Sequence, residues 1–160
     1  MKGKEKQVYI KNAPPKLYWL VRVFFPNHCF NCRVAFSFAN TIYTKYNLDE
    51  EVNKDIYAHE LVHLRQMRYN IVYSIIHLTR YLLSKKFRYK TEIEGYKAQY
   101  FYIEERPHIY RDIEQTLKNT INEFKKSSVY PEKTEEEIAK DLCLENSQIY
   151  KNLKKKSQPS

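Results

Sequence analysis

The scarcity of glycine is the feature that most limits what this chain can fold into. Its 160 residues include only two glycines. Gly3 lies in a polar N-terminal stretch, so Gly95 is the only glycine in the body of the sequence. Glycine-rich phosphate loops, both the dinucleotide fingerprint and the P-loop, are therefore excluded. Many-turned all-β folds are disfavoured because tight turns need glycine. We expect a fold dominated by helices.

The pattern of apolar residues predicts one β region followed by several helices. The β region covers 34–45, with a break at Ala39–Asn40. A further helical region begins at Thr134, where Glu137 completes a capping box. We therefore expect an α+β fold that is predominantly helical. The other expected helices cover about 49–69, 71–84, 91–105 and 110–126, with the basic residues 85–90 as a link between the second and the third.

The sequence His59-Glu60-Leu61-Val62-His63 gives the H-E-x-x-H pattern inside a predicted helix. Histidines four residues apart leave one face of a helix about one turn apart, so both rings can bind the same zinc ion. Glu60 lies beside them, where its carboxylate can deprotonate a zinc-bound water. We expect His59 and His63 as zinc ligands and Glu60 as the catalytic base. The alternative is a helix that carries two ordinary histidines.

A catalytic zinc needs a third protein ligand and an open position. The five residues after His63 include no histidine, so the third ligand must come from a later element. Glu92 and Glu94 on the next predicted helix but one are the candidates. His77 and His108 are rivals. His77 lies among apolar residues, which is typical of a packed core position, and His108 follows a proline in a predicted loop.

Residues 34–105 resemble the gluzincin metallopeptidases in the order of their elements. In that family an edge strand, an H-E-x-x-H helix, a connecting helix and a helix with a zinc-binding glutamate follow one another. The segment 59–66, His-Glu-Leu-Val-His-Leu-Arg-Gln, is also similar to small bacterial and phage gluzincin-like domains. Residues 92–96, Glu-Ile-Glu-Gly-Tyr, resemble the E-x-E-A-D segment of the membrane-associated CAAX-processing peptidases, whose first glutamate binds zinc.

The resemblance implies roles for four residues of segment 92–96. Glu92 is implied as the third zinc ligand, and Gly95 as the position that lets its helix pass close to the metal-binding helix. Tyr96 stands where the CAAX-processing family has an aspartate that orients a zinc-binding histidine. Glu94 is a candidate for that orienting role, and the alternative is a place on a solvated face. The sequence does not single out an oxyanion-stabilising residue among its 15 tyrosines, and Tyr96 and Tyr100 would be guesses.

The resemblance also implies a function and a domain organisation. The chain is expected to be a zinc metalloendopeptidase-like hydrolase that acts on a protein or peptide substrate with Zn2+ as its cofactor. A small zincin-like sheet is expected beside the H-E-x-x-H helix and the glutamate-bearing helix. The expected domains are a flexible N-terminal lead at 1–16, the metallopeptidase domain at 17–130, and a C-terminal helical appendage with a basic tail at 131–160.

A basic binding module is the alternative function. The net charge of +9 permits binding to nucleic acid or to an anionic membrane. Residues 134–156 follow a pattern similar to a helix-turn-helix, although Cys143 stands where glycine is usual. In this interpretation the zinc site is structural or inactive. The apolar segment 71–83, followed by basic residues 85–90, is a candidate for contact with an anionic membrane surface, but burial of that helix explains the same residues.

Cysteine usage and hydropathy indicate a cytoplasmic protein. The three cysteines have no disulfide-framework spacing, and Cys29 and Cys32 form a lone C-x-x-C that we interpret as two ordinary thiols. The N-terminus has no signal-peptide pattern. The strongest apolar stretch, 71–83, contains His77 and Arg80 and is too short to span a bilayer.

Overall fold

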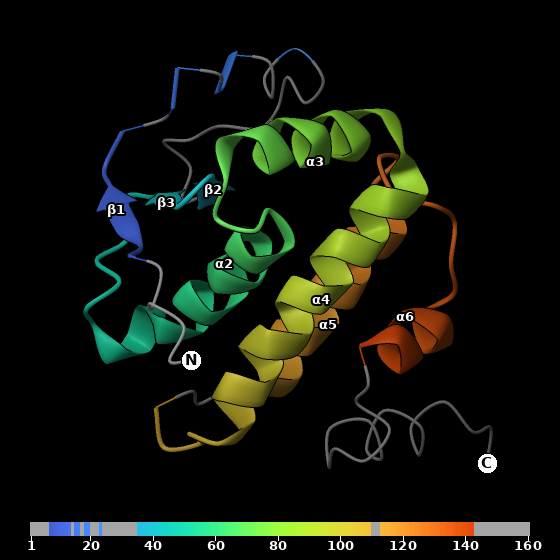
Figure 1. Ribbon diagram of the computed structural model, residues 1–160. Helices are drawn as coiled ribbons and strands as arrows, with labels where there is room; N and C mark the ends of the chain where they lie inside the picture. The colour runs from blue at the N-terminus through green and yellow to red at the C-terminus, as the bar shows by residue number, and fades with distance from the viewer. Residues whose placement is uncertain are drawn as a thin grey trace, which may run out of the picture.

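The computed structural model describes residues 7–13, 15–16, 18–19, 23, 35–109 and 113–142. They form a small sheet with helices on both of its sides and a long helical body beside it (Figure 1). The expected predominantly helical α+β fold is confirmed. The elements are β1 (Tyr9–Lys11), β2 (Phe36–Phe38), β3 (Thr41–Tyr43), the 3-10 helix η1 (Glu51–Asn53), α2 (Lys54–Gln66), α3 (Ile71–Leu83), α4 (Lys85–Glu104), α5 (Ile113–Lys126) and α6 (Glu135–Asp141).

The sheet has the strand order β1-β3-β2. Strands β2 and β3 pair in antiparallel fashion across the two-residue turn Ala39–Asn40, where Ala39 adopts the left-handed conformation with φ 56°. The expected break in the β region is thus the turn of a hairpin. Strand β1 pairs in parallel with β3. It lies in the N-terminal lead, where no strand was expected, because its three exposed residues carry no alternating apolar pattern.

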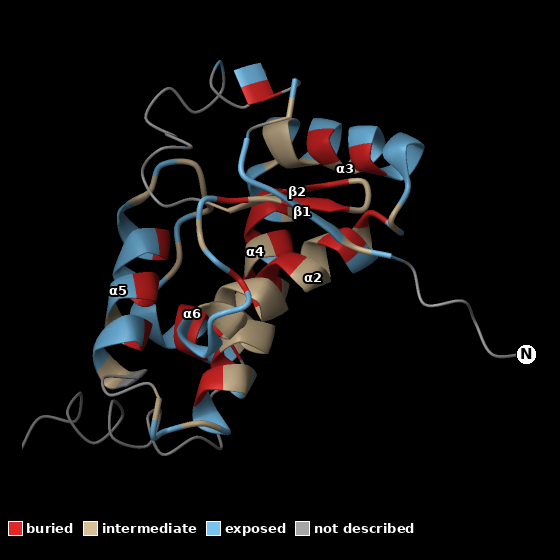
Figure 2. Ribbon diagram, turned by 90° about the vertical axis from the view of Figure 1, so that its left-hand side faces the viewer, coloured by how far each residue is buried: buried red, intermediate tan, exposed pale blue. Residues whose placement is uncertain are grey.

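The hairpin is packed between α3 and α2, as Figures 1 and 2 show. Phe38 contacts Leu78 of α3 in one buried cluster, and Ile42 packs with Leu64 of α2 in another. Neighbouring side chains of a strand point to opposite faces, so Ser37 must face α2 while Phe38 faces α3. The hairpin therefore presents one polar side chain to the helix that carries the H-E-x-x-H motif.

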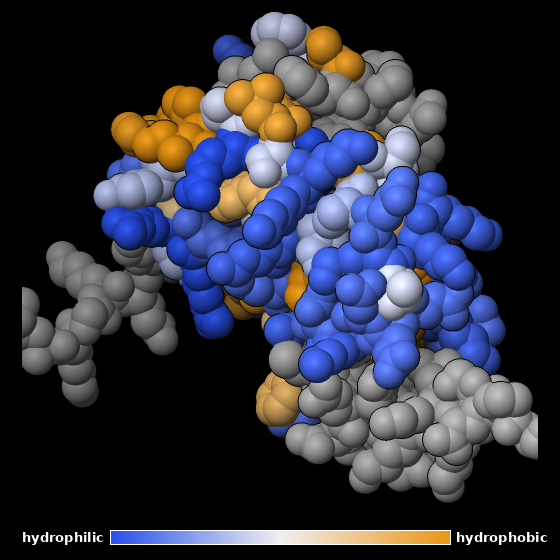
Figure 3. All heavy atoms as spheres, turned by 90° about the vertical axis from the view of Figure 1, so that its right-hand side faces the viewer, coloured by the Kyte–Doolittle hydropathy of each residue, from blue (hydrophilic) through white to orange (hydrophobic). Residues whose placement is uncertain are grey.

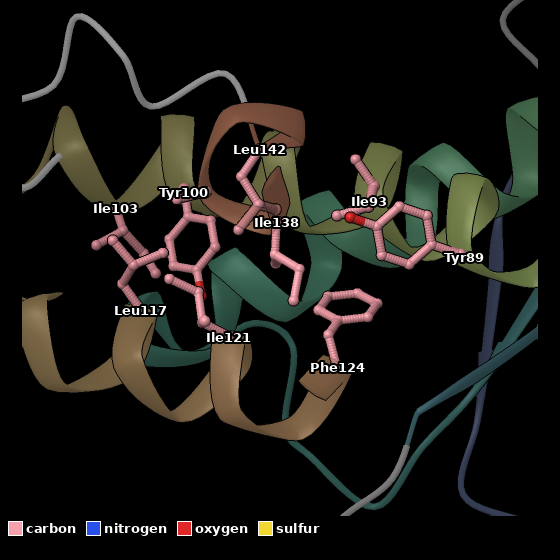
Figure 4. Close-up of a cluster of buried hydrophobic side chains, with 10 residues drawn as sticks. Tyr89, Ile93, Tyr100, Ile103, Leu117, Ile121, Phe124, Ile138 and Leu142 are labelled. Atoms are coloured by element: carbon pink, nitrogen blue, oxygen red, sulfur yellow. The ribbon is translucent and has the colours of Figure 1, made fainter. Parts of the chain in front are cut away.

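A separate core joins α4, α5 and α6 (Figure 4). Tyr100 of α4 and Leu117 of α5 are almost fully buried there, together with Ile138 and Leu142 from the α6 region. The predicted capping box at Thr134 and Glu137 is confirmed. The first part of the proposed helix-turn-helix thus uses its apolar residues to pack against the body. Residues 143–160, with the rest of that pattern, lie outside the described residues.

Three predicted helix boundaries are wrong. Helix α2 begins at Lys54 rather than at about 49, and the residues Glu51–Asn53 before it form the 3-10 helix η1. Helix α4 begins at Lys85 rather than at about 91, because the Ser84 hydroxyl accepts a hydrogen bond from the Phe87 amide and caps the helix. The basic residues 85–90 are therefore its first turns and not a link, and lysine and arginine are good helix formers. Helix α2 ends at Gln66 rather than at about 69, because Arg68 and Tyr69 adopt positive φ angles of 54° and 52°.

Among the described residues, no helix combines the length and the apolar character that crossing a bilayer requires.

Candidate metal centre

The H-E-x-x-H residues lie where α2 packs against α4. This is the most extensive contact between two elements of the described structure, and Gly95 of α4 lies against the ring of His59 in it. His59 is buried and the His63 side chain is nearly so. Their Nε2 atoms are only 3.0 Å apart, so the expected alignment of two imidazoles on one helix face is confirmed.

Glu92 of α4 brings a carboxylate to these two nitrogens. Its Oε2 lies 3.5 Å from His59 Nε2, and its Oε1 lies 3.9 Å from His63 Nε2. Tetrahedral zinc with bonds of about 2.0–2.1 Å holds its donor atoms about 3.3 Å apart. The three observed separations lie on both sides of that value. Two imidazoles and one carboxylate are also a typical donor set for catalytic zinc.

The electrostatics of this cluster favour a charged carboxylate. Burial alone raises the pKa of Glu92, but contact with His59 and the positive charge of the two imidazoles outweigh it and lower the pKa to about 2. Burial also lowers the pKa of His59, but the hydrogen bond and negative charge of Glu92 outweigh it, so the pKa is raised overall. In the absence of metal the two groups therefore stabilise each other as an ion pair.

Glu60 is buried beside the two histidines. Ligand atoms of His59, Glu60 and His63 all lie within 4.8 Å of one another. The hydroxyl of Ser37 donates a 2.6 Å hydrogen bond to Oε2 of Glu60 and lies 3.1 Å from the backbone oxygen of the same residue. Sequence reasoning missed Ser37. The sequence contains one hint of it: Ser37 is a polar residue between two phenylalanines, Phe36 and Phe38, in the expected β region.

Gln66 connects His63 to a second carboxylate. The amide nitrogen of Gln66 donates a 2.7 Å hydrogen bond to Glu94 Oε2 and lies 3.5 Å from the carbonyl oxygen of Thr91. The amide oxygen of Gln66 lies 3.0 Å from His63 Nδ1, and an amide oxygen can only accept a hydrogen bond. Nδ1 of His63 therefore carries the proton, which leaves the Nε2 lone pair for a metal. Glu94 thus contacts Gln66 and is suited to orient His63 through it, the role considered for it from the sequence.

The surroundings of His59 are tight and only partly hydrogen-bonded. A Cβ at Gly95 would lie 2.7 Å from Nε2 of the ring, which confirms the expected close approach. The ring of Tyr96 meets that of His59 edge-on, with centroids 4.7 Å apart. The buried Nδ1 atom of His59 has no hydrogen-bond partner among the described residues. Gln99 also contributes to the raised pKa of His59. Its amide nitrogen donates a 2.7 Å hydrogen bond to Oδ2 of Asp55.

Tyr81 is a further residue that the sequence did not indicate. It extends from α3, and its hydroxyl donates a 2.7 Å hydrogen bond to Oε1 of Glu92. Tyr100, considered for the oxyanion, has its hydroxyl 3.5 Å from the carbonyl of Thr116 in the α4–α5 contact. Tyr81 therefore reaches the Glu92 carboxylate, whereas the Tyr100 hydroxyl is directed to α5.

The ligand atoms that cluster among the described residues are those of His59, Glu60 and His63, and the rival ligands are not among them. Glu92 is not in that cluster either, and its place at the site rests on its contacts with the two histidines. The ring of His77 packs edge-on against Phe87 at 5.0 Å, and burial, followed by the positive charge of His63, lowers its pKa to about 4. His108 is exposed in a turn. Cys29 and Cys32 lie outside the described residues, so their interpretation as ordinary thiols stays a prediction.

Comparison with protein-family models, with curated proteins and with solved structures finds no significant match for this chain. The functional argument therefore rests on the geometry of the site.

Proposed function

We propose that this chain is a zinc-dependent metallopeptidase of the gluzincin kind. His59, His63 and Glu92 are the ligands in this proposal. The observation that carries it is the convergence of their donor atoms at separations of 3.0, 3.5 and 3.9 Å. A second carboxylate, that of Glu60, lies within 4.8 Å of the ligand atoms of His59 and His63.

Glu60 is the general base in the proposed reaction. A bound zinc would supply Lewis acidity to polarise the water and the peptide carbonyl. Glu60 takes the proton from the attacking water and passes it to the leaving amine. Ser37 holds Oε2 of Glu60, so Oε1 is the oxygen assigned to that proton. Gln66 keeps Nε2 of His63 unprotonated and directed to the metal position.

The place of β2 supports a peptide substrate. The sheet order puts β2 at one end, so within the described part of the sheet it has one paired edge and one unpaired edge. Its Ser37 touches the proposed base. An extended peptide that adds to such an edge gains backbone hydrogen bonds with little dependence on its side chains. This arrangement would carry the scissile bond past Glu60.

The first test is the zinc content of protein purified without added metal. We expect one zinc per chain, lost in Glu92→Ala and kept in the matched variant Glu94→Ala. Glu60→Gln should keep its zinc and lose at least about a hundredfold of the cleavage of labelled casein. Wild-type protein that takes up no zinc even after reconstitution would overturn the proposal.

The basic binding module remains the alternative function. Its specific test is charge reversal of Lys154, Lys155 and Lys156, which should abolish DNA retention without changing zinc content. A zinc-free wild type that binds DNA through these lysines would favour the alternative. Zinc-dependent cleavage that survives the charge reversal would favour the peptidase.

A further inference from the structure

Helix α3 leaves much of its apolar surface outside the protein. A surface helix normally buries its apolar face. Here the side turned to the protein includes Ser74, which is fully buried, and Tyr81, which reaches Glu92. The side turned away carries Val72, Ile75 and Ile76, which are 58, 49 and 51% exposed.

These exposed side chains form one continuous surface. The outer face of α3, as we name it, consists of Ile71, Val72, Ile75, Ile76 and Leu83. Their spacing of three, four and seven residues places them on one side of the helix. Figure 3 shows apolar atoms gathered in the upper part of the molecule, where α3 lies, above a hydrophilic surface. Contiguous apolar patches of this kind mark interaction sites, whereas single exposed apolar residues do not.

Positive charge borders the outer face of α3. Between Glu60 and Glu92 the chain contains no aspartate or glutamate. Arg80, Lys85 and Lys86 are exposed beside the apolar residues. The ion pairs among the described residues include none of these three side chains. Arg80 lies over the ring of Phe87, with 4.3 Å between the guanidinium carbon and the ring centroid. The surface therefore combines apolar area with cations that have no ion-pair partner among the described residues.

We propose that the outer face of α3 docks on an anionic membrane surface, with the helix lying in the plane of the interface. Its 13 residues span about 20 Å, which is less than the hydrocarbon thickness of about 30 Å. The apolar residues would enter the boundary between headgroups and acyl chains, and Arg80, Lys85 and Lys86 would meet lipid phosphates.

Other occupants fit this surface less well. Nucleic acid would engage the cations but would leave the apolar residues against water and phosphate. A second copy of the chain would cover the apolar residues, but the same surface of the partner would offer Arg80, Lys85 and Lys86 no carboxylate, because the chain has no aspartate or glutamate between Glu60 and Glu92. An anionic lipid surface satisfies both the apolar and the charged residues.

Docking on this surface is compatible with the proposed metal centre and does not depend on it. Tyr81 contacts Glu92 from the opposite side of α3. A membrane on the outer face therefore leaves the cluster of His59, His63 and Glu92 on the protein side of the helix. Zinc content is expected to be the same with and without lipid.

Vesicle co-sedimentation tests the proposal on the full chain. The probes are phosphatidylcholine vesicles with and without 30% phosphatidylglycerol. We expect binding only to the anionic vesicles. The variant Val72→Ser/Ile75→Ser/Ile76→Ser and the variant Lys85→Glu/Lys86→Glu should each lower the partition coefficient by about tenfold or more. The matched control Lys126→Glu/Lys140→Glu makes the same change of charge on exposed residues of α5 and α6 and should bind nearly as wild type.

Three results would overturn the proposal. The first is wild-type protein that stays in the supernatant with both kinds of vesicle. The second is equal loss of binding in the control variant, which would indicate attraction by net charge alone. The third is a dimer that the triple serine variant abolishes without any vesicle binding, which would assign the outer face to a second copy. Circular dichroism of each variant confirms that a loss of binding is not a loss of folding.

Discussion

A Cβ atom at position 95 would lie 2.7 Å from Nε2 of His59. Real Cβ contacts are almost never this short, so Gly95→Ala must displace the ring or separate α2 from α4. We expect zinc affinity to fall by about tenfold or more, because the displaced nitrogen is one of the proposed donor atoms. Isothermal titration with zinc measures this change.

The stability of the same variant gives an internal check. Alanine in place of glycine inside a helix normally stabilises a protein by up to about 1 kcal/mol. Overpacking of a tight contact costs about 1–3 kcal/mol. We therefore expect Gly95→Ala to lower the free energy of unfolding in urea. An increase in that free energy together with unchanged zinc affinity would mean that the close contact does not position His59.

The hydrogen bond from Ser37 to Glu60 predicts a defect in turnover. Ser37→Ala leaves one oxygen of a buried carboxylate without its donor, and hydrogen bonds to charged groups contribute about 1.5–3 kcal/mol. If Glu60 is the base, kcat on labelled casein should fall by about ten- to a hundredfold, while zinc content stays the same. Steady-state kinetics and zinc analysis of Ser37→Ala and of the wild type measure the two quantities.

Ser74→Ala is the matched control for Ser37→Ala. Ser74 is also buried, and its hydroxyl accepts a hydrogen bond from the Ala39 amide in the same hairpin, but it does not contact Glu60. This variant should lose some stability and keep its kcat. Equal kcat losses in the two variants would show that Ser37 acts only by holding the hairpin in place.

Replacement of Gln66 should weaken metal binding rather than slow turnover. Gln66→Leu keeps the approximate volume of the side chain but removes the link from His63 Nδ1 to Glu94. The imidazole is then free to rotate and to change tautomer, so zinc affinity should fall by about ten- to a hundredfold. Glu94→Gln is a milder change, because an amide oxygen can still accept from Gln66. Zinc titration of both variants should therefore rank Gln66→Leu as the weaker binder, and the reverse order would contradict this role.

The parts of the site that lie within one helix turn were predictable from the sequence. His59, Glu60 and His63 have fixed relative positions as soon as the segment is helical. Glu92 and Glu94 were both candidates from the sequence, and only the gluzincin resemblance favoured Glu92, because a contact between α2 and α4 depends on tertiary packing. Ser37 and Tyr81 approach from other elements, and nothing in their local sequence points to a contact with a glutamate, so only the structure brings them to Glu60 and Glu92.

The environment of α3 shows where reasoning from apolar pattern fails. Burial was the preferred explanation for the apolar residues of 71–83, and it is wrong for the outer face of α3. An amphipathic pattern indicates that a helix has two faces but not which of them meets the protein. The choice is made by Ser74, whose hydroxyl accepts from Ala39, and by Tyr81, which bonds to Glu92. These two tertiary hydrogen bonds, together with the packing of Leu78 against Phe38, fix which side of α3 meets the protein.

Without metal, the free energy of unfolding should depend on pH through the ionisation of Glu92 and His59. The pKa of Glu92 is lowered from 4.5 to about 2, so its contribution to stability is present above pH 4.5 and is lost as the pH falls towards 2. The pKa of His59 is raised above 6.5, so its contribution is present below pH 6.5 and is lost as the pH rises through the raised value. Protein in EDTA should therefore have a higher urea midpoint at pH 6 than at pH 8.5.

Glu92→Gln should remove most of that difference, because a neutral amide no longer favours the charged imidazole of His59. Zinc should reverse the trend in the wild type, since protons compete with the metal for His59 and His63 and binding strengthens as they leave. Urea melts at the two pH values, with EDTA and with zinc, give all of these comparisons. A fall in stability with rising pH that is the same in Glu92→Gln as in the wild type would assign the effect to groups outside the His59–Glu92 pair.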